Sequence, residues 1–375
     1  MPCSLILPKE TCNRLAAHVT DLRNGRIRPG GRLAKVLASA DLSTLTDYQL
    51  LAALLDTKEP CIFAESAVHG DGTDWTLGEL ALLGDVSVAT DVTVYDDGSH
   101  RSPSVHPEPF PATLVFTPGA LLRNETGHTP ADWAEATTPS GELDLVGYAQ
   151  LYNRRLRPVF DYIQNHAMQL GVTALVTVPG LGCGQFAGRF RGQLGVQLER
   201  VLETFLANHA HEWTALRAVY YDPYQESVPR RVRHHGVDFL VRPLSLTPGG
   251  GHPQLCPPAN YAETDADDFA SSRLYSLVAW DHVSWPGNDF NAGQRATDDG
   301  VKAAATSALH ALTGIAGHYD SANNAYTPPS PYSTWSEILK GRRFPDFPRF
   351  TPCPTCPQHE TEVKPANHKT RAVPK

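Results

Sequence analysis

Residues 280–300 have the sequence WDHVSWPGNDFNAGQRATDDG, and the fold is best predicted from this stretch outward. An apolar run at residues 275–280 predicts a buried strand before it, and residues 301–312 predict a helix after it. Like charges crowded into the Gly-rich turn between them repel one another, so a ligand, a metal ion or a proton-transfer task explains them better than a structural purpose. The turn holds four carboxylates, those of Asp281, Asp289, Asp298 and Asp299.

Helix capping is the plainer explanation for part of this acidic loop. Thr297, Asp298 or Asp299 could cap the following helix, which stabilises a helix by roughly 0.5–2 kcal/mol. Capping accounts for one or two of the carboxylates, but for neither Asp281 nor Asp289. The sequence therefore predicts a functional role for Asp281, Asp289 and Asp299.

A second loop, residues 178–188 with the sequence VPGLGCGQFAG, follows a β-branched run and precedes a predicted helix at residues 191–207. Its glycines permit backbone N–H groups to approach an anion closely, with a helix N-terminus behind them. We therefore expect a phosphate here, and a tight turn without a ligand is the alternative. The loop also matches G-x-G-x-x-A, but the acidic residue that a nicotinamide dehydrogenase needs about twenty positions on is missing.

Strands alternate with helices from residue 86 to residue 312, which predicts a layered α/β domain with a parallel or mixed sheet. Ligands in such folds bind beyond the carboxyl ends of the strands, so both loops should open on one edge. Residues 102–111 contain four prolines and predict a loop or an edge crossing. Arg154, Arg155 and Arg157, in a long predicted helix, are expected on a solvated face.

Composition limits the class of protein. The net charge of −8 over 375 residues argues against a duplex nucleic-acid binder, and no window approaches the roughly 18 apolar residues of a membrane span. Seven scattered cysteines favour a reducing compartment, and the lone pair Cys353 and Cys356 is expected to be a tail feature rather than a zinc site. We expect a cytoplasmic protein, or one delivered into a host cytosol. The expected organisation is a helical flank (1–80), a catalytic domain (81–345) and a disordered tail (346–375).

With both loops in view, the chain resembles the macrodomain-type ADP-ribosylglycohydrolases, and in particular the family of the Legionella effector MavL. Residues 178–188 are similar to the macrodomain phosphate loop, and the three aspartates of that family are matched at Asp281, Asp289 and Asp299. The resemblance covers about residues 86–312. It implies a three-layer α/β sandwich with a mixed, largely parallel central sheet and extra flanking helices.

Two positions differ from the macrodomain pattern or are not fixed by it. Many macrodomains carry an Asn-rich triple-glycine loop after an early strand, whereas residues 117–124 contain only one glycine. This difference argues against chemistry of the poly(ADP-ribose) glycohydrolase type and favours the aspartate-cluster variety. An acidic residue near the first strand often holds the adenine amino group in macrodomains, and here Asp85 or Asp91 could do so.

The resemblance implies a hydrolase that removes ADP-ribose from protein, with arginine as the expected linkage and ubiquitin as a candidate carrier. Water would attack the anomeric carbon, positioned by Asp299 or Asp289, while Asp281 contacts the substrate arginine or the ribose. No cofactor and no metal ion are expected. A non-catalytic ADP-ribose reader and a Mg²⁺-dependent phosphoesterase remain the alternatives. The expected ligand contacts are Gly180, Gly182, Cys183, Gly184, Gln185, Phe186, Asn288, Phe290 and Asp298.

Overall fold

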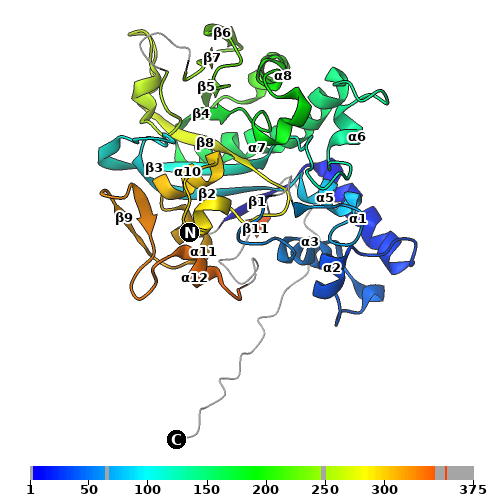
Figure 1. Cartoon of the computed structure of the whole chain (residues 1–375). Coiled ribbons are helices and arrows are strands. Elements are labelled where there is room, and N and C mark those ends of the chain that lie inside the picture. The colour runs from blue at the N-terminus through cyan, green and yellow to red at the C-terminus, as the bar shows by residue number, and fades with distance from the viewer. Residues whose placement is uncertain (1–2, 64–66, 246–250, 343–350, 353–375) are drawn as a thin grey trace, which may run out of the picture.

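The computed structural model describes residues 3–63, 67–245, 251–342 and 351–352. Within these ranges, a nine-stranded sheet forms the centre of the molecule (Figure 1). From one edge to the other, its strands are β11 (Thr351–Pro352), β1 (Ser4–Ile6), β2 (Ser87–Asp96), β3 (Val105–Pro118), β8 (Ser272–Trp280), β4 (Thr173–Pro179), β5 (Leu216–Asp222), β7 (Val237–Val241) and β6 (Arg230–His234).

The middle of the sheet is parallel. Strands β3, β8, β4, β5 and β7 run in one direction, whereas β2 and β6 are antiparallel to their neighbours. Strand β1 is antiparallel to β2 and parallel to β11. The predicted mixed, largely parallel sheet is therefore confirmed. Because parallel strands end at the same edge, the loops after β3, β8, β4 and β5 all leave from it.

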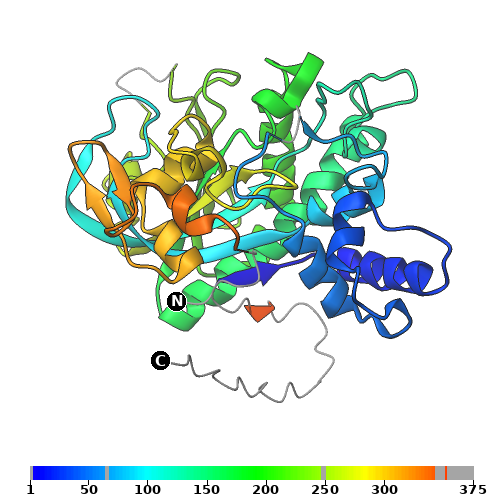
Figure 2. The same cartoon turned by 60° about the horizontal axis from the view of Figure 1, so that its bottom comes forward.

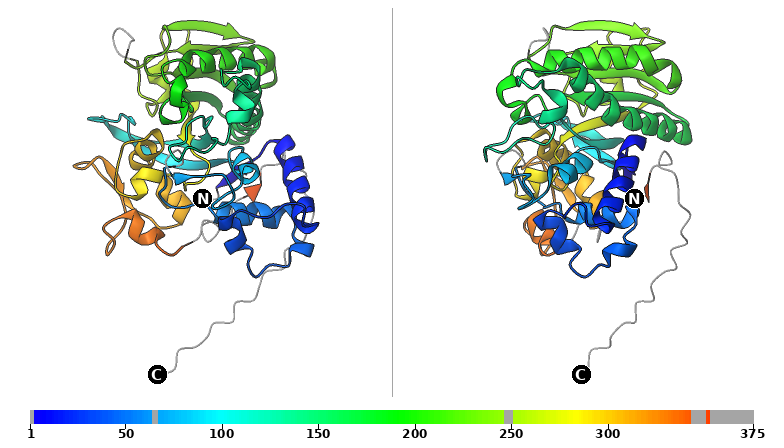
Figure 3. Two further views of the ribbon diagram at one scale, coloured as in Figure 1. Left: turned by 45° about the vertical axis from the view of Figure 1, so that its right-hand side comes forward. Right: turned by 90° about the vertical axis from the view of Figure 1, so that its right-hand side faces the viewer.

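Helices cover both faces of the sheet (Figure 3). On one face α7 (Leu145–Leu170) and α8 (Leu194–His209) pack with Val176 and Val178 of β4. On the other face α10 (Asp298–Ala305) and α11 (Ala308–Thr313) pack with Leu175 of the same strand, because successive strand residues point to opposite faces. The predicted three-layer sandwich is confirmed.

The N-terminal helices form a further apolar cluster beside the sheet, on the flank opposite the hairpin of β9 (His318–Asp320) and β10 (Ala325–Thr327) (Figure 2). They pack on Leu121 and Val283, in the loops after β3 and β8. Residues 1–80, predicted as a helical flank, also contain β1 of the central sheet, and the last helix crosses the predicted boundary. The N-terminal helices are α1 (Lys9–Arg23), α2 (Gly31–Val36), α3 (Asp47–Asp56) and α5 (Leu77–Leu83).

The predicted disordered tail, residues 346–375, lies outside the described residues except for β11, and so do Cys353 and Cys356. The remaining short helices are α6 (Trp133–Ala136), α9 (Asn288–Asn291) and α12 (Trp335–Leu339), together with 3₁₀ turns at Leu42–Thr44, Gln185–Phe190, Ala210–Glu212 and Pro258–Tyr261.

From Val105 onward the proline-rich segment is the first part of β3 and not a loop, and the predicted alternative of an edge segment fits it better. Strand β3 begins at Val105 and pairs with β2 there and again from Phe110 onward, with an irregular register between, whereas its pairing with β8 starts only at Ala112. Pro107, Pro109 and Pro111 all precede the first residue of β3 that pairs with β8, so they lie where the strand has a neighbour on one side only. Proline is tolerated at such an edge position.

Contrary to the prediction, the three arginines of α7 do not all lie on a solvated face. The Arg155 side chain is only 1% exposed and donates to Asp132 (2.7 Å) and Asp85 (3.2 Å). Arg154 forms ion pairs with Asp85 and Glu135. Helical periodicity could not reveal this arrangement, because the acidic partners come from segments far away in the chain. Buried charges of both signs compensate one another here.

Candidate functional site

Both predicted loops leave the same edge of the sheet, because β4 and β8 are parallel neighbours. The loop after β3 joins them. The Gly119 amide donates to the Trp280 carbonyl (3.3 Å), and a Cβ on Gly119 would lie 2.3 Å from the Gly182 amide nitrogen. The predicted common edge is confirmed.

Tyr152 of α7 fixes the glycine loop from behind. Its hydroxyl accepts from the Ala120 amide (3.0 Å) and donates to the Leu181 carbonyl (2.5 Å), so one side chain ties the loops after β3 and β4 together. Gly182 has φ of +70°, and a Cβ there would lie 2.7 Å from the Ala120 nitrogen. Only glycine fits this position without strain.

The other side of the glycine loop is open. A Cβ on Gly184 would meet no atom within 4 Å, and the amides of Gly184 and Gln185 have no acceptor among the described residues. An open hollow of about 460 Å³ adjoins the loop, and its arginines suit an anionic ligand. Its lining residues are Arg123, Gly184, Gln185, Gly188, Arg189 and Arg191.

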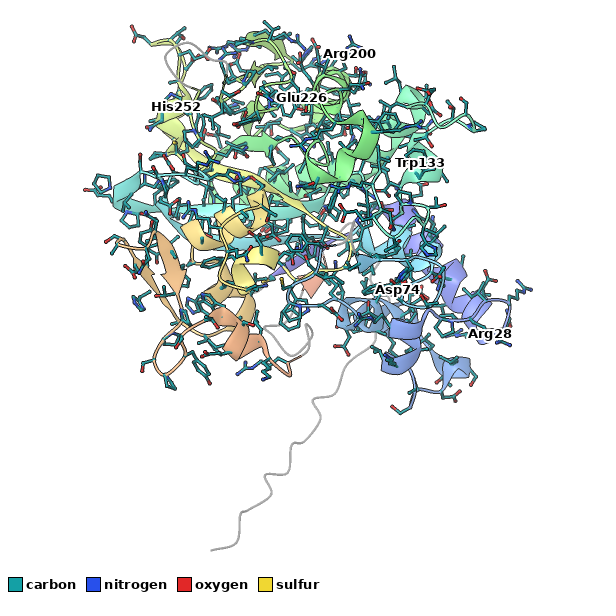
Figure 4. The ribbon with its side chains drawn as sticks, in the orientation of Figure 1. Arg28, Asp74, Trp133, Arg200, Glu226 and His252 are labelled. Atoms are coloured by element: carbon teal, nitrogen blue, oxygen red, sulfur yellow. The ribbon has the colours of Figure 1, made fainter. Side chains whose placement is uncertain are left out.

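Two of the lining side chains are held in place. The Arg189 guanidinium lies 5.2 Å from the ring centroid of Trp133, which Figure 4 shows on α6 at the margin of the molecule. Arg123 donates to the Gln185 side chain (2.7 Å). Of the other predicted contacts, the Cys183 thiol is buried and donates to the Leu181 carbonyl, and burial raises the pKa of that thiol. Phe186 is half-buried against the N-terminal helices.

Asp281 is buried at the start of the acidic loop. One carboxylate oxygen accepts from the amides of Val283 (2.7 Å) and Ser284 (2.6 Å). The other accepts from the Ser284 hydroxyl and from the Asn288 side-chain amide (3.2 Å). Its carboxylate therefore accepts four hydrogen bonds from the loop that it begins.

Asp299 lies close to Asp281 and accepts fewer hydrogen bonds. Its two oxygens accept from the amides of Gly287 (2.7 Å) and Asn288 (3.0 Å). Asn288 therefore bridges the two aspartates, with its backbone amide on Asp299 and its side chain on Asp281. Burial raises the pKa of Asp299 well above its usual range, and the charges of Asp281 and Asp289 raise that pKa further.

Asp289 holds the beginning of α10. It accepts from the amides of Ala296 (2.6 Å) and Thr297 (3.0 Å) and from the Thr297 hydroxyl. Thr297 is the N-cap of α10 and accepts from the Gly300 amide, and a Cβ on Gly300 would lie 2.2 Å from the Asp289 carboxylate. The sequence Thr-Asp-Asp-Gly thus makes a cap that needs glycine beside an aspartate.

Two further predicted contacts have structural partners. Asp298 accepts from the Ala279 amide (2.8 Å) and pairs with Lys302 (3.1 Å). The Phe290 ring is only 8% exposed and packs in the apolar core. The one-turn helix α9 turns this ring inward, an orientation that the sequence pattern does not reveal.

Neither candidate for the adenine-binding acid is free at the site. Asp85 is buried and accepts from Thr11, Arg14 and Arg154, as well as from Arg155. Asp91 pairs in register with Thr113 near the amino ends of the parallel strands, away from the edge with the two loops. It forms an ion pair with Arg273 there.

Lys58 is a site residue that the sequence did not single out. It is only 4% exposed, its ammonium donates to the His282 carbonyl (2.7 Å), and it lies 4.0 Å from the centroid of the Trp280 ring. Burial lowers the pKa of Lys58 to about 7, although the charges of Asp281 and Asp299 act to raise that pKa. A lone lysine before Glu-Pro carries no pattern that could have identified it.

No group of three or more His, Cys, Asp or Glu side chains in the described ranges could hold a metal ion. No helix among those residues is both long and apolar enough to cross a membrane.

A family model described as "Macrodomain effector MavL" matches residues 3–332. This match covers more of the chain than residues 86–312, over which the sequence resembles the family, because it also includes the N-terminal helices and the β9–β10 hairpin. The search of curated proteins gives no match.

Proposed function

The chain belongs to the MavL family of macrodomain effectors, and from this premise we propose that it removes ADP-ribose from modified proteins. Family membership supports an ADP-ribose-related function. The hydrolysis, the arginine linkage and ubiquitin as the carrier are our proposals.

The observation that carries the proposal is the convergence of an anion cradle and a cluster of buried aspartates on one edge of the sheet. In the proposed complex, the free amides of the glycine loop hold the diphosphate, and the arginines beside them neutralise it. The sugar then extends toward the acidic loop, where carboxylates stabilise positive charge at the anomeric carbon.

The three aspartates have different remaining hydrogen-bonding capacity. An ionised carboxylate offers about four lone-pair sites. Asp281 accepts four hydrogen bonds, Asp289 three and Asp299 two, so Asp299 retains the most capacity for an attacking water. We assign the water to Asp299 and the leaving group or ribose to Asp281. Asp289 then acts by holding α10, and Asp299 with it.

The test is turnover of proteins that carry ADP-ribose on arginine, on glutamate or on serine, followed by mass spectrometry. We expect release from arginine, and a loss of at least about 100-fold in kcat for Asp299→Ala. Activity in excess EDTA is expected to be unchanged, which would exclude the phosphoesterase alternative. Turnover of Asp299→Ala at the wild-type rate would overturn the assignment.

A non-catalytic reader is the second candidate, and one observation favours it. The carboxylates of Asp281 and Asp289 are largely satisfied by their own loop, as structural carboxylates are. A reader would bind ADP-ribose in calorimetry and release it from none of the three linkages. Calorimetry beside the turnover assay therefore separates the two functions.

A further inference from the structure

Part of the N-terminal region runs directly along the acidic loop. The Glu59 amide donates to the Val283 carbonyl (2.9 Å), and the Trp285 amide donates to the Glu59 carbonyl (2.7 Å). Further along, Asn288 exchanges two hydrogen bonds of 2.8 Å with the backbone of Ile62. Residues 58–62 thus hold the asparagine that bridges Asp281 and Asp299.

Lys58 is the positive charge that this segment brings to the aspartates. Its ammonium is fixed by the His282 carbonyl and the Trp280 ring, and in the described residues it forms no ion pair with a carboxylate. It therefore acts on Asp281 and Asp299 through space. The other charged side chain of the segment, Glu59, is paired with Arg32, and the Cys61 thiol is exposed.

A buried cation held on a carbonyl needs a reason, because a methionine of similar length would fill the same space without desolvating a charge. The neighbouring like-charged carboxylates supply that reason. Asp299 is harder to ionise beside the charges of Asp281 and Asp289, and the buried cations Lys58 and Lys302 offset that repulsion.

We propose that Lys58 is a positioning residue of the acidic site, whose buried side chain fixes the start of the acidic loop at the His282 carbonyl and the Trp280 ring and places a positive charge beside Asp281 and Asp299 for attack on the sugar. This inference rests on the proposed hydrolase function for its kinetic consequence. Its electrostatic content is independent of that function.

The experiment compares Lys58→Met, Lys58→Arg and the wild type. We expect Lys58→Met to move the acid limb of the kcat/KM profile to higher pH by about one unit or more, because the carboxylates lose a cation. Lys58→Arg keeps the charge and should keep the limb in place. Lys35→Met, at an exposed lysine on α2, is the matched control for the substitution itself. It should leave the acid limb of the kcat/KM profile where it is in the wild type. A merely structural role would lower activity equally at every pH.

A second measurement needs no turnover. Titration of ¹³C-labelled aspartate carboxyls by NMR reports the pKa of Asp299 directly. A higher pKa in Lys58→Met than in the wild type supports the proposal, and an unchanged pKa overturns it. If Lys58→Met does not fold, the same comparison is made with Lys58→Gln. Absence of turnover in the wild type would overturn the proposed function, and the titration would still decide the role of Lys58.

Discussion

Gly182→Ala is the substitution whose effect the structure allows us to work out most fully. The residue has φ of +70°, and a side chain there would cost about 1–2 kcal/mol in backbone strain. The added Cβ would also lie 2.7 Å from the Ala120 nitrogen and 3.0 Å from the Tyr152 hydroxyl. Overpacking of this kind costs about 1–3 kcal/mol more. We therefore expect the free energy of unfolding to fall by about 2–5 kcal/mol.

Gly171→Ala is the matched control for this experiment. Gly171 has φ of +68° at the end of α7, and a Cβ there would meet no atom within 4 Å. It should carry only the strain of about 1–2 kcal/mol, with ADP-ribose affinity unchanged. Urea denaturation measures the stability of both variants, and calorimetry measures their ADP-ribose binding. Gly182→Ala should bind at least about tenfold more weakly, a loss of about 1.4 kcal/mol. Equal stabilities and equal affinities in the two variants would refute the reasoning.

Three further predictions concern buried polar groups. Asp299 keeps its proton to a higher pH in the folded than in the unfolded chain. The free energy of unfolding should therefore fall by up to about 1.4 kcal/mol per pH unit as the pH rises above the unfolded pKa of Asp299. Denaturation of Asp299→Asn across the same pH range should lack this fall. Tyr152→Phe leaves the Ala120 amide and the Leu181 carbonyl without their shared partner, and should cost about 1–3 kcal/mol in a urea melt and weaken ADP-ribose binding. Arg155→Met removes the arginine partner of buried Asp132, while Asp85 keeps Arg14 and Arg154. The substitution should cost about 3–5 kcal/mol, and a melt like that of the wild type would contradict the burial of this charge.

The sequence predicted the layered fold and the common edge because both depend on local signals. Apolar runs, glycines and clustered aspartates lie in short stretches, and parallel strands necessarily bring their loops to one edge. The role of Asp289 could not be predicted, because its partners become visible only when the loop folds back on α10. The same limit applies to Phe290, whose short helix has no periodicity to assign a face.

The residues that the sequence missed come from parts of the chain distant from the two loops. Lys58 precedes the acidic loop by more than two hundred residues in the sequence. Asp85 and Arg155, which form a buried ion pair, are seventy residues apart in the sequence. Such pairings depend on tertiary packing, and a single sequence carries no record of them. The match of the family to residues 3–332 is consistent with a unit larger than the two loops and the sheet between them.

The N-terminal helices are part of the acidic site, and their packing explains why. Val283 and Leu121 are loop residues of the sheet edge, and their apolar side chains are buried in this helical cluster. Without the N-terminal region, both side chains would lose that packing, and Asn288 would lose its two partners at Ile62. Asn288 is also the bridge between Asp281 and Asp299, so its release would loosen the aspartates that the proposed chemistry needs. Residues 58–62 therefore connect the stability of the flank to the geometry of the site, and a truncation that removes them should lose activity together with stability.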